Sequence, residues 1–178
     1  FPKLNAPFNR HPHHATGEGG YLNSLHYTDW AIGEFFNKAK NEHWFENTIF
    51  VITADHVLAH FQNGGLLERF RIPLIFYAPK LLKPRIIETV SSQLDLMPTF
   101  IEFMGLDAEY TAFGTSLLRK QESFALVREG SLVGIITDRA YLKHSLSRRM
   151  ESGKLVDNVP DSYFDKLEAR LLAWDRVA

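Results

Sequence analysis

One stretch of the sequence decides the fold: Thr48-Ile49-Phe50-Val51-Ile52-Thr53-Ala54-Asp55-His56. Its first seven residues form a short, β-branched and nearly continuous apolar run, which is typical of a strand buried on both faces of a parallel sheet. A second run of this kind covers residues 72–78 and ends at Pro79. Its own Pro73 belongs at the beginning of the strand, where a proline is tolerated. The two runs therefore predict two strands of an α/β sheet.

A helix is predicted before the first strand, over residues 21–40. Side chains of its apolar face recur at three- and four-residue steps: Leu25, Thr28, Ile32, Phe35, Phe36 and Ala39. The aromatic residues in and after this helix are expected in the core, because their spacing is helical: Phe35, Phe36, Trp44 and Phe45.

The remainder of the chain predicts two more helices and a set of short strands. A helix covers residues 96–104, and a terminal helix begins at Pro160. The candidates for capping the first of these are Ser91, Ser92 and Asp95, with Gly105 as its stop. Residues 123–128, 132–137 and 139–143 alternate or cluster like the strands of an antiparallel meander. No repeat or linker is evident, so one compact α/β unit with an antiparallel annex is expected.

Composition excludes several classes of function. The chain has 178 residues, with 20 Lys plus Arg against 21 Asp plus Glu, and a formal net charge of −1. This near-neutral charge gives no electrostatic reason to bind nucleic acid or an anionic membrane. Cysteine is absent, which excludes disulfides and thiolate metal sites. No apolar run is long enough to span a bilayer. The loop-like residues 1–8 favour a piece of a longer protein.

Asp55 and His56 are the most informative polar residues, because they directly follow the first predicted strand. Ligands of open α/β sheets bind at the carboxyl ends of strands, where the loops converge on a crevice. A carboxylate beside an imidazole offers one oxygen and one nitrogen ligand, a set that suits Zn²⁺ or Mn²⁺. The alternative is structural, with Asp55 capping the loop and His56 packing against it.

The other histidines fall into two groups. His11, His13 and His14 lie in one loop and are candidates for holding a metal or for hydrogen-bonding an anionic oxygen, unless the loop is simply solvated. His60 lies in the loop beyond His56, within reach of the same crevice, or else at the surface. The remaining histidines are expected to be structural: His26 as a packing residue of the first helix, His43 and His144.

Basic residues give weaker indications. Arg69 and Arg71 either bind phosphate or pair with a carboxylate such as Glu68. A solvated face is expected for a basic cluster late in the chain: Arg139, Lys143, Arg148, Arg149 and Lys154. The sequence has no Walker-type phosphate loop, no Gly-x-Ser-x-Gly elbow, no Cys-containing sulfatase motif and no His-Glu-x-x-His motif. No serine or threonine stands in a context that marks a nucleophile.

Five motifs follow one another along the chain: Tyr27–Phe36, Asn47–His56, Glu68–Pro79, Asp95–Thr99 and Phe113–Leu118. In this order they closely resemble the sulfatase branch of the alkaline phosphatase superfamily, and most of all lipoteichoic acid synthases and phosphoglycerol transferases. The resemblance covers about residues 20–145.

The resemblance implies a metal-dependent chemistry. Members of this group bind a divalent metal through a glutamate, a nucleophilic threonine, and an aspartate and histidine that Asp55 and His56 match. Mn²⁺ is the metal expected here, with Zn²⁺, Mg²⁺ and Ca²⁺ as alternatives. The threonine attacks a phosphoryl group, and an acceptor hydroxyl or water later releases it. A histidine of the loop before the first helix helps to bind substrate, which points to His11, His13 or His14, with His60 as a further candidate.

The resemblance also implies an architecture and a location. The expected fold is α/β, an alkaline-phosphatase-like sheet flanked by helices, with a small antiparallel C-terminal sub-region. Residues 1–178 would be the C-terminal portion of a catalytic domain. Within it, residues 1–20 would form an active-site loop, 21–120 the α/β core, and 121–178 the meander plus terminal helix. The nucleophile and the glutamate ligand would lie upstream, so no catalytic nucleophile is expected in this segment. An N-terminal region absent from this chain would anchor the protein, with the domain in the periplasm or outside the cell.

Three functions follow from this sequence. The first is a phosphoglycerol transferase or sulfatase-like enzyme that acts on an anionic ester, such as a phosphoglycerol lipid or an envelope glycan. The second is a sulfuric-ester or phosphodiester hydrolase that uses water as the acceptor. The third is a non-catalytic envelope-binding domain that keeps the fold.

Overall fold

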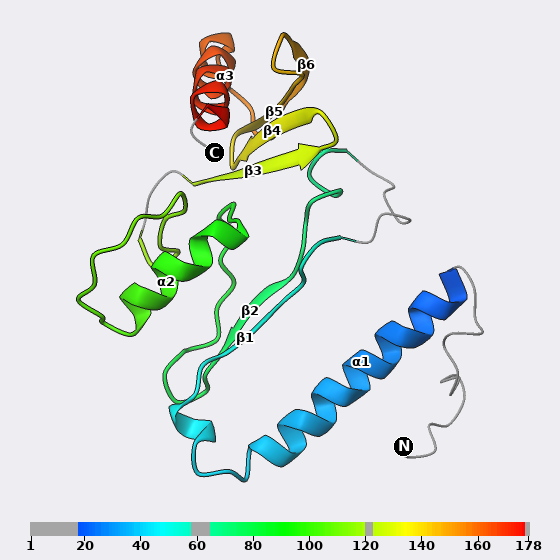
Figure 1. The fold of residues 1–178 in the computed structure, drawn as a ribbon, viewed down its shortest axis with the longest axis vertical. Helices are drawn as coiled ribbons and strands as arrows, with labels where there is room; N and C mark the ends of the chain where they lie inside the picture. Colours follow the sequence, from blue (N-terminus) through cyan, green and yellow to red (C-terminus); the bar gives the residue numbers. More distant parts are fainter. Residues whose placement is uncertain (1–17, 58–64, 120–122, 177–178) are drawn as a thin grey trace. The chain divides into compact units, whose positions relative to one another are not determined.

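The computed structural model describes residues 18–57, 65–119 and 123–176, which form two compact units, Phe1–Arg85 and Ile86–Ala178 (Figure 1). The sequence predicts one compact unit, and the two units correct that prediction. Their boundary falls within residues 83–89, where every side chain is exposed, so little packing crosses this segment. Its ordinary composition gives no sign of a linker.

The first unit contains one long helix and a two-stranded ribbon. Helix α1 spans Glu18–Ala39, which confirms the helix predicted over residues 21–40. Strand β1 (Phe50–Thr53) and strand β2 (Leu74–Tyr77) also lie where the two apolar runs predict strands.

The direction and burial of these strands differ from the prediction. β1 pairs with β2 antiparallel, in a register that places Phe50 opposite Tyr77 and Thr53 opposite Leu74 (Figure 1). Neither strand contains a buried residue, so the prediction of parallel strands buried on both faces is wrong for this ribbon. An apolar run indicates that both faces of a strand are apolar. The direction of the strand relative to its neighbour depends instead on the path of the chain that connects the two strands.

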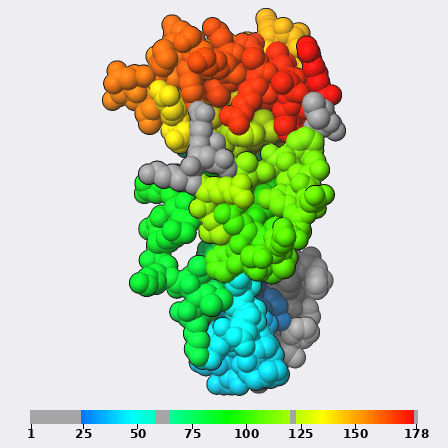
Figure 2. Space-filling view, turned by 90° about the vertical axis from the view of Figure 1, so that its left-hand side faces the viewer, coloured from blue at the N-terminus to red at the C-terminus, as the bar shows by residue number. Residues whose placement is uncertain are grey.

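Aromatic rings pack β1 against the end of α1 and against a 3-10 helix at Phe45–Asn47. The ring of Phe50 lies 5.0 Å from that of Phe36 and 5.1 Å from that of Phe45, centroid to centroid. Tyr77 of β2 joins the group, 5.4 Å from Phe36. The four aromatic residues predicted in the core do pack together, but only Phe45 is buried, whereas Phe35 is 48% exposed and Trp44, in the surface segment between α1 and β1 that is cyan in Figure 2, is 37% exposed.

The second unit begins with a short 3-10 helix, Gln93–Asp95, that leads into helix α2, Leu96–Phe103. The backbone N–H of Ser92 donates to Asp95 Oδ2 over 2.7 Å, which confirms that these residues cap the start of the helix. Gly105 has a φ of 62° and follows the helix, as the sequence predicts.

The buried carboxylate of Asp95 also holds a later loop against α2. Its Oδ1 accepts a hydrogen bond from the backbone N–H of Thr115 at 2.8 Å, and Asp95 is only 4% exposed. The hydroxyl of Thr99 in turn accepts the backbone N–H of Leu117 at 2.9 Å. The loop lies so close that a Cβ atom added at Gly114 would stand 2.2 Å from the carbonyl oxygen of Leu94.

We expect Gly114→Ala to lower the free energy of unfolding by about 1–3 kcal/mol, because the added methyl group meets backbone that cannot rotate away. Denaturant titration followed by circular dichroism measures this change. Gly33→Ala is the matched control: it adds a methyl group in α1 with nothing within 4 Å, and should leave stability unchanged or raise it by up to about 1 kcal/mol. Equal stability of the two variants would contradict the close approach.

A four-stranded antiparallel sheet and helix α3 (Asp161–Asp175) complete the second unit (Figure 1). The strands are neighbours in chain order: β3 (Phe124–Glu129), β4 (Leu132–Thr137), β5 (Ala140–His144) and β6 (Arg149–Lys154). The first three confirm the predicted meander, and α3 confirms the terminal helix. The sequence does not predict β6, because Arg-Met-Glu-Ser-Gly-Lys lacks the apolar alternation that marks a half-buried strand.

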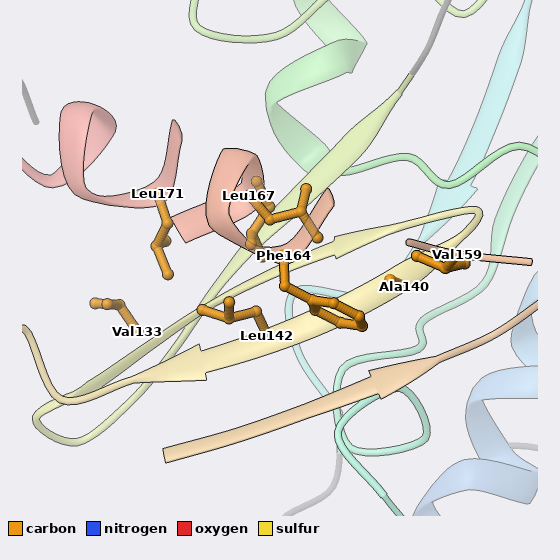
Figure 3. Packing of buried hydrophobic residues seen from close by; sticks show 8 residues of the cluster. Val133, Ala140, Leu142, Val159, Phe164, Leu167 and Leu171 are labelled. Carbon is orange, nitrogen blue, oxygen red and sulfur yellow. The ribbon is translucent and has the colours of Figure 1, made fainter. Parts of the chain in front are cut away.

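The core of this unit lies between α3 and one face of the sheet. Figure 3 shows Phe164, Leu167 and Leu171 of α3 beside residues of β4 and β5. The cluster consists of Val133, Ile135, Ala140, Leu142, Val159, Phe164, Leu167 and Leu171. Ile135 and Leu142 have no exposed surface at all, so this is the most completely buried part of the described chain.

A network of polar side chains links β5, β6 and α3 at the end of this core. His144 is 2% exposed, and its Nε2 lies 2.8 Å from Glu168 Oε1. Arg149 donates through Nε to Glu168 Oε2 at 3.2 Å and through a terminal nitrogen to Asp165 at 3.0 Å. The structural role predicted for His144 is confirmed.

The predicted solvated basic face is wrong for two of its members. Arg149 pairs with carboxylates of α3, as above, and the side chain of Lys143 is only 14% exposed and pairs with Glu129 at 2.5 Å. Arg149 faces the helix α3, and Lys143 faces Glu129 of β3. A charge count cannot detect this, because the acidic partners lie far away in the sequence.

The pKa of Glu168 supplies a test of the network formed by His144, Arg149 and Glu168. Hydrogen bonds from Arg149, the largest effect, and from His144 lower that pKa below its ordinary 4.5, although burial opposes them. A lowered pKa stabilises the fold above the pKa of the unfolded chain, and the stabilisation is lost as pH falls through the folded-state value. We therefore expect stability to fall below about pH 4.5 more steeply in the wild type than in Arg149→Met.

Urea titrations at several pH values between neutrality and strong acid measure these slopes. Arg128→Met is the control, because Arg128 is an exposed arginine of β3 in the same sheet. Its slope should match the wild type. Parallel curves for all three proteins would remove Glu168 and Arg149 from the acid response.

Candidate functional site

Asp55 and His56 lie just beyond the carboxyl end of β1, which is where the sequence places them. Their side chains are 87% and 77% exposed. Both polar groups are therefore accessible to a ligand from solvent, and neither packs in the core. Of the structural alternative, the packing of His56 against the loop disagrees with this exposure, whereas Asp55 does accept a backbone N–H of the loop, as the alternative predicts.

Local hydrogen bonds orient the two side chains. Asp55 Oδ1 accepts the backbone N–H of His56 at 2.8 Å. On the ring of His56, Nδ1 lies 2.8 Å from the carbonyl oxygen of Val57. The second carboxylate oxygen, Oδ2, stands 3.6 Å from His56 Nε2.

This arrangement fits half of a metal site. A carbonyl oxygen only accepts hydrogen bonds, so Nδ1 must carry the proton and a neutral ring keeps its lone pair on Nε2. A histidine that ligates a metal through one nitrogen is commonly held in this way through the other. Two ligands that bind one ion at about 2.1 Å each stand about 3–3.5 Å apart. The 3.6 Å between Oδ2 and Nε2 is close to that separation.

No third ligand joins the pair within the described ranges. Over residues 18–57, 65–119 and 123–176, no group of three or more histidines, cysteines, aspartates or glutamates is arranged to hold a metal. The other predicted site residues, His11, His13, His14 and His60, lie outside the described residues and stay predictions. A metal at this site therefore needs ligands beyond Asp55 and His56.

Other residues considered in the sequence have surface positions. His26 is exposed on α1, so its predicted packing role is wrong. The apolar residues near it on this helix are exposed as well, so no packed surface among the described residues surrounds its ring. His43 is exposed as well. Arg69 is half-buried and Arg71 exposed, and the choice between phosphate binding and a carboxylate partner stays open. In the described part of the chain, the structure adds no functional residue that the sequence missed.

The model of the sulfatase family matches residues 18–106, which include α1, β1, the Asp55-His56 pair, β2 and α2. This match covers half of the chain.

The chain belongs to the sulfatase family.

The relatives of this chain include proteins named as transferases or synthases and proteins named as sulfatases. The lipoteichoic acid synthase-like protein YvgJ of Bacillus subtilis is 27% identical over 144 residues, which are 70% of this chain and 23% of that protein. The N-acetylglucosamine-6-O-sulfatase of Bacteroides thetaiotaomicron is 31% identical, over 54% of this chain and 19% of its own. Phosphoglycerol transferase I of Xanthomonas euvesicatoria is 28% identical, over 60% and 15%. The chain spans about a fifth of the length of these relatives.

Solved structures support the fold. A protein of the alkaline phosphatase superfamily from Vibrio parahaemolyticus matches 99% of this chain and 45% of its own, with a TM-score of 0.75 at 22% identity. A second structure, solved in complex with its substrate D-glucosamine-2-N,6-O-disulfate, matches 88% of this chain and 39% of its own, with a TM-score of 0.57 at 21% identity. The predicted α/β, alkaline-phosphatase-like class is thereby confirmed.

Among the described residues, no helix combines the length and the apolar character needed to cross a membrane.

The tautomer of His56 provides a direct test of the site. At a pH where the imidazole is neutral, we expect the Nδ1–H form, because Nδ1 donates to the Val57 carbonyl. Long-range ¹H–¹⁵N correlation spectra distinguish the two nitrogens, and added Zn²⁺ should shift the Nε2 resonance. His43 is the control, since its ring makes no hydrogen bond within the described structure and should respond little to zinc. An Nε2–H form of His56 would contradict the proposed orientation.

Proposed function

We propose that this chain is the C-terminal portion of a metal-dependent, sulfatase-family enzyme that transfers or hydrolyses a phosphate or sulfate ester outside the cytoplasm. The observation that carries the proposal is the paired orientation of Asp55 Oδ2 and His56 Nε2 at the end of β1. Both residues lie within the segment that matches the family model. Phosphoglycerol transfer is the preferred reaction, because lipoteichoic acid synthases and phosphoglycerol transferases recur among the relatives.

Asp55 and His56 would hold the metal, with Mn²⁺ the first choice and Zn²⁺, Mg²⁺ or Ca²⁺ as alternatives. The bound ion would supply positive charge that stabilises the negative oxygens of the ester and acidifies a nearby hydroxyl. Asp55 contributes a negative charge and Oδ2, and the Val57 carbonyl keeps His56 Nε2 unprotonated and aimed at the same point. The nucleophile and an acidic ligand would come from polypeptide outside this chain, and His11, His13, His14 and His60 would bind the anionic substrate.

The substrate and the location belong to the same proposal. The proposed substrate is a phosphoglycerol lipid or an envelope glycan, since the relatives are named for lipoteichoic acid synthesis, phosphoglycerol transfer and a sulfated N-acetylglucosamine. A region outside this chain would attach the enzyme to the membrane. Nucleic acid is not an expected partner, given the net charge of −1.

Sulfate-ester hydrolysis is the second candidate function. It is favoured by the N-acetylglucosamine-6-O-sulfatase relative, which is 31% identical to this chain over the matched residues. In that case water, rather than an acceptor hydroxyl, takes up the sulfo group that the nucleophile holds covalently and releases it as sulfate, which frees the nucleophile. A non-catalytic envelope-binding domain would keep the fold without metal or turnover.

The test uses the natural full-length protein, as wild type and as Asp55→Ala. We expect the wild type to contain a stoichiometric divalent metal by elemental analysis, and Asp55→Ala to lose most of it together with at least about a hundredfold of its turnover. The assays are release of glycerol phosphate to an acceptor and hydrolysis of p-nitrophenyl phosphate and p-nitrophenyl sulfate. The pattern of substrates separates transferase from sulfatase.

Asp29→Ala, which removes an exposed carboxylate from α1, is the matched control and should keep both metal and activity. The 178-residue chain alone should show no turnover. Full metal content in Asp55→Ala would remove Asp55 from the ligands, and a metal-free wild type without turnover would favour the non-catalytic domain.

A further inference from the structure

The end of α2 and the loop that follows it line a pocket of about 440 Å³ in the second unit. The chain turns away from α2 at Gly105 and returns beside it, where the backbone N–H of Thr115 donates to Asp95 (Figure 1). Arg119 then reaches the helix and donates through Nε to Glu102 Oε2 at 2.9 Å, and both of these side chains line the pocket. The volume lies within the range of small-molecule sites in proteins, about 300–1,000 Å³.

One part of the lining is apolar and aromatic. It is formed by Ile101 of α2 and by Leu106 and Tyr110 of the loop. Leu106 is 53% exposed and Tyr110 is 42% exposed, so a ligand can reach both side chains from solvent. A tyrosine ring presents a flat apolar face with a hydroxyl at its edge, which suits a ligand that is itself partly apolar and partly polar.

The other part of the lining carries groups that can form hydrogen bonds with a ligand. Within the described ranges, the two terminal nitrogens of Arg119, the carboxylate of Asp107 and the hydroxyl of Tyr110 have no hydrogen-bond partner in the protein. Glu102 is held in place by hydrogen bonds from Ser116 and Arg119. These bonds, of which that from Ser116 has the largest effect, lower the pKa of Glu102 below 4.5, although burial opposes them. The pocket therefore offers both donors and acceptors.

The charges of the lining disfavour an anionic ligand. Glu102 and Asp107 are negative, and Arg119 is the one basic residue among those that line the pocket, so their sum is 1 − 2 = −1. The guanidinium of Arg119 is also already paired with Glu102. A phosphate or sulfate group would therefore be repelled. A metal ion is disfavoured as well, since the described residues contain no group of three or more side chains arranged to hold one.

Uncharged sugars match this combination of groups. A pyranose ring has an apolar face of C–H groups that stacks on an aromatic ring, and its adjacent hydroxyls pair with the two nitrogens of a guanidinium or the two oxygens of a carboxylate. We propose that the pocket binds an uncharged sugar residue of a glycan, with the ring on Tyr110 and the hydroxyls on Arg119 and Asp107. Such a site holds a glycan through sugars that carry no phosphate or sulfate, and it does not rest on the metal chemistry proposed above.

Saturation-transfer NMR on the natural full-length protein tests the inference, because the method detects weak binding of a small sugar to a large protein. The probes are N-acetylglucosamine, chitotriose and maltotriose, and glycerol phosphate and sulfate serve as competitors. Tyr110→Ala and Arg119→Lys alter the pocket on opposite sides of the Thr115 contact. Met104→Ala is the matched control, because Met104 is an exposed residue directly after α2 that does not line the pocket. Asp55→Ala is measured as well.

We expect at least one trisaccharide to bind the wild type, and more tightly than N-acetylglucosamine. Tyr110→Ala should raise its Kd about tenfold because the stacking ring is lost. Arg119→Lys should raise it by a similar factor, because lysine keeps the charge but lacks the planar fork. Met104→Ala and Asp55→Ala should keep the wild-type Kd, and neither anion should compete. Two pocket variants, each checked for its fold by circular dichroism, keep the test valid if one of them folds poorly.

Several results would overturn the inference. Absence of saturation transfer to every probe would mean that the pocket of the natural protein takes no sugar, and equal Kd values for chitotriose and N-acetylglucosamine would assign it to a free monosaccharide. An unchanged Kd in both pocket variants would place the binding elsewhere, and loss of binding in Asp55→Ala would place it at the candidate metal site. Displacement of the sugar by glycerol phosphate or sulfate would make the pocket an anion site. None of these readouts depends on metal content or turnover, so they are distinct from a failure of the proposed function.

Discussion

The candidate site depends on the aromatic packing around Phe50. Five rings surround it in the described structure, with centroid distances from 5.0 Å to 6.2 Å. β1 has four residues and a single pairing partner, so its backbone hydrogen bonds alone would hold it weakly. Burial of aromatic surface fixes the strand instead, and thereby fixes where it ends and where Asp55 and His56 begin.

The second unit uses buried polar groups in addition to its apolar core. Asp95 holds a loop twenty residues away through the backbone N–H of Thr115, and Glu168 joins His144 to Arg149 across two strands and a helix. Each of these acceptors has a specific donor, which is the condition under which burying a polar group does not destabilise a fold. Such bonds also select one arrangement of loop and helix, because any shift would leave a buried carboxylate without its donors.

Local sequence patterns predict the elements better than they predict the pairing. Helix α1, the meander and α3 have clear periodicity, and Asp55 and His56 could be placed at the end of β1 because a continuous apolar run stops directly before them. The direction of β1 could not be predicted, since pairing depends on residues twenty or more positions away. The role expected of His26 failed because periodicity shows that a helix has an apolar face, but not what covers it. The orientation of His56 came only from the structure, through the carbonyl of its neighbour Val57.

The order of elements in the second unit has a consequence for synthesis. The sheet that carries Ile135 and Leu142 leaves the ribosome before α3, the helix that buries them. During that interval an apolar sheet face is exposed together with the ring of His144, whose partner Glu168 lies in α3. A surface of this kind is bound by chaperones and promotes aggregation. Packing of α3 against the sheet then closes the core. The nascent chain is therefore exposed to aggregation until its synthesis has passed Leu171.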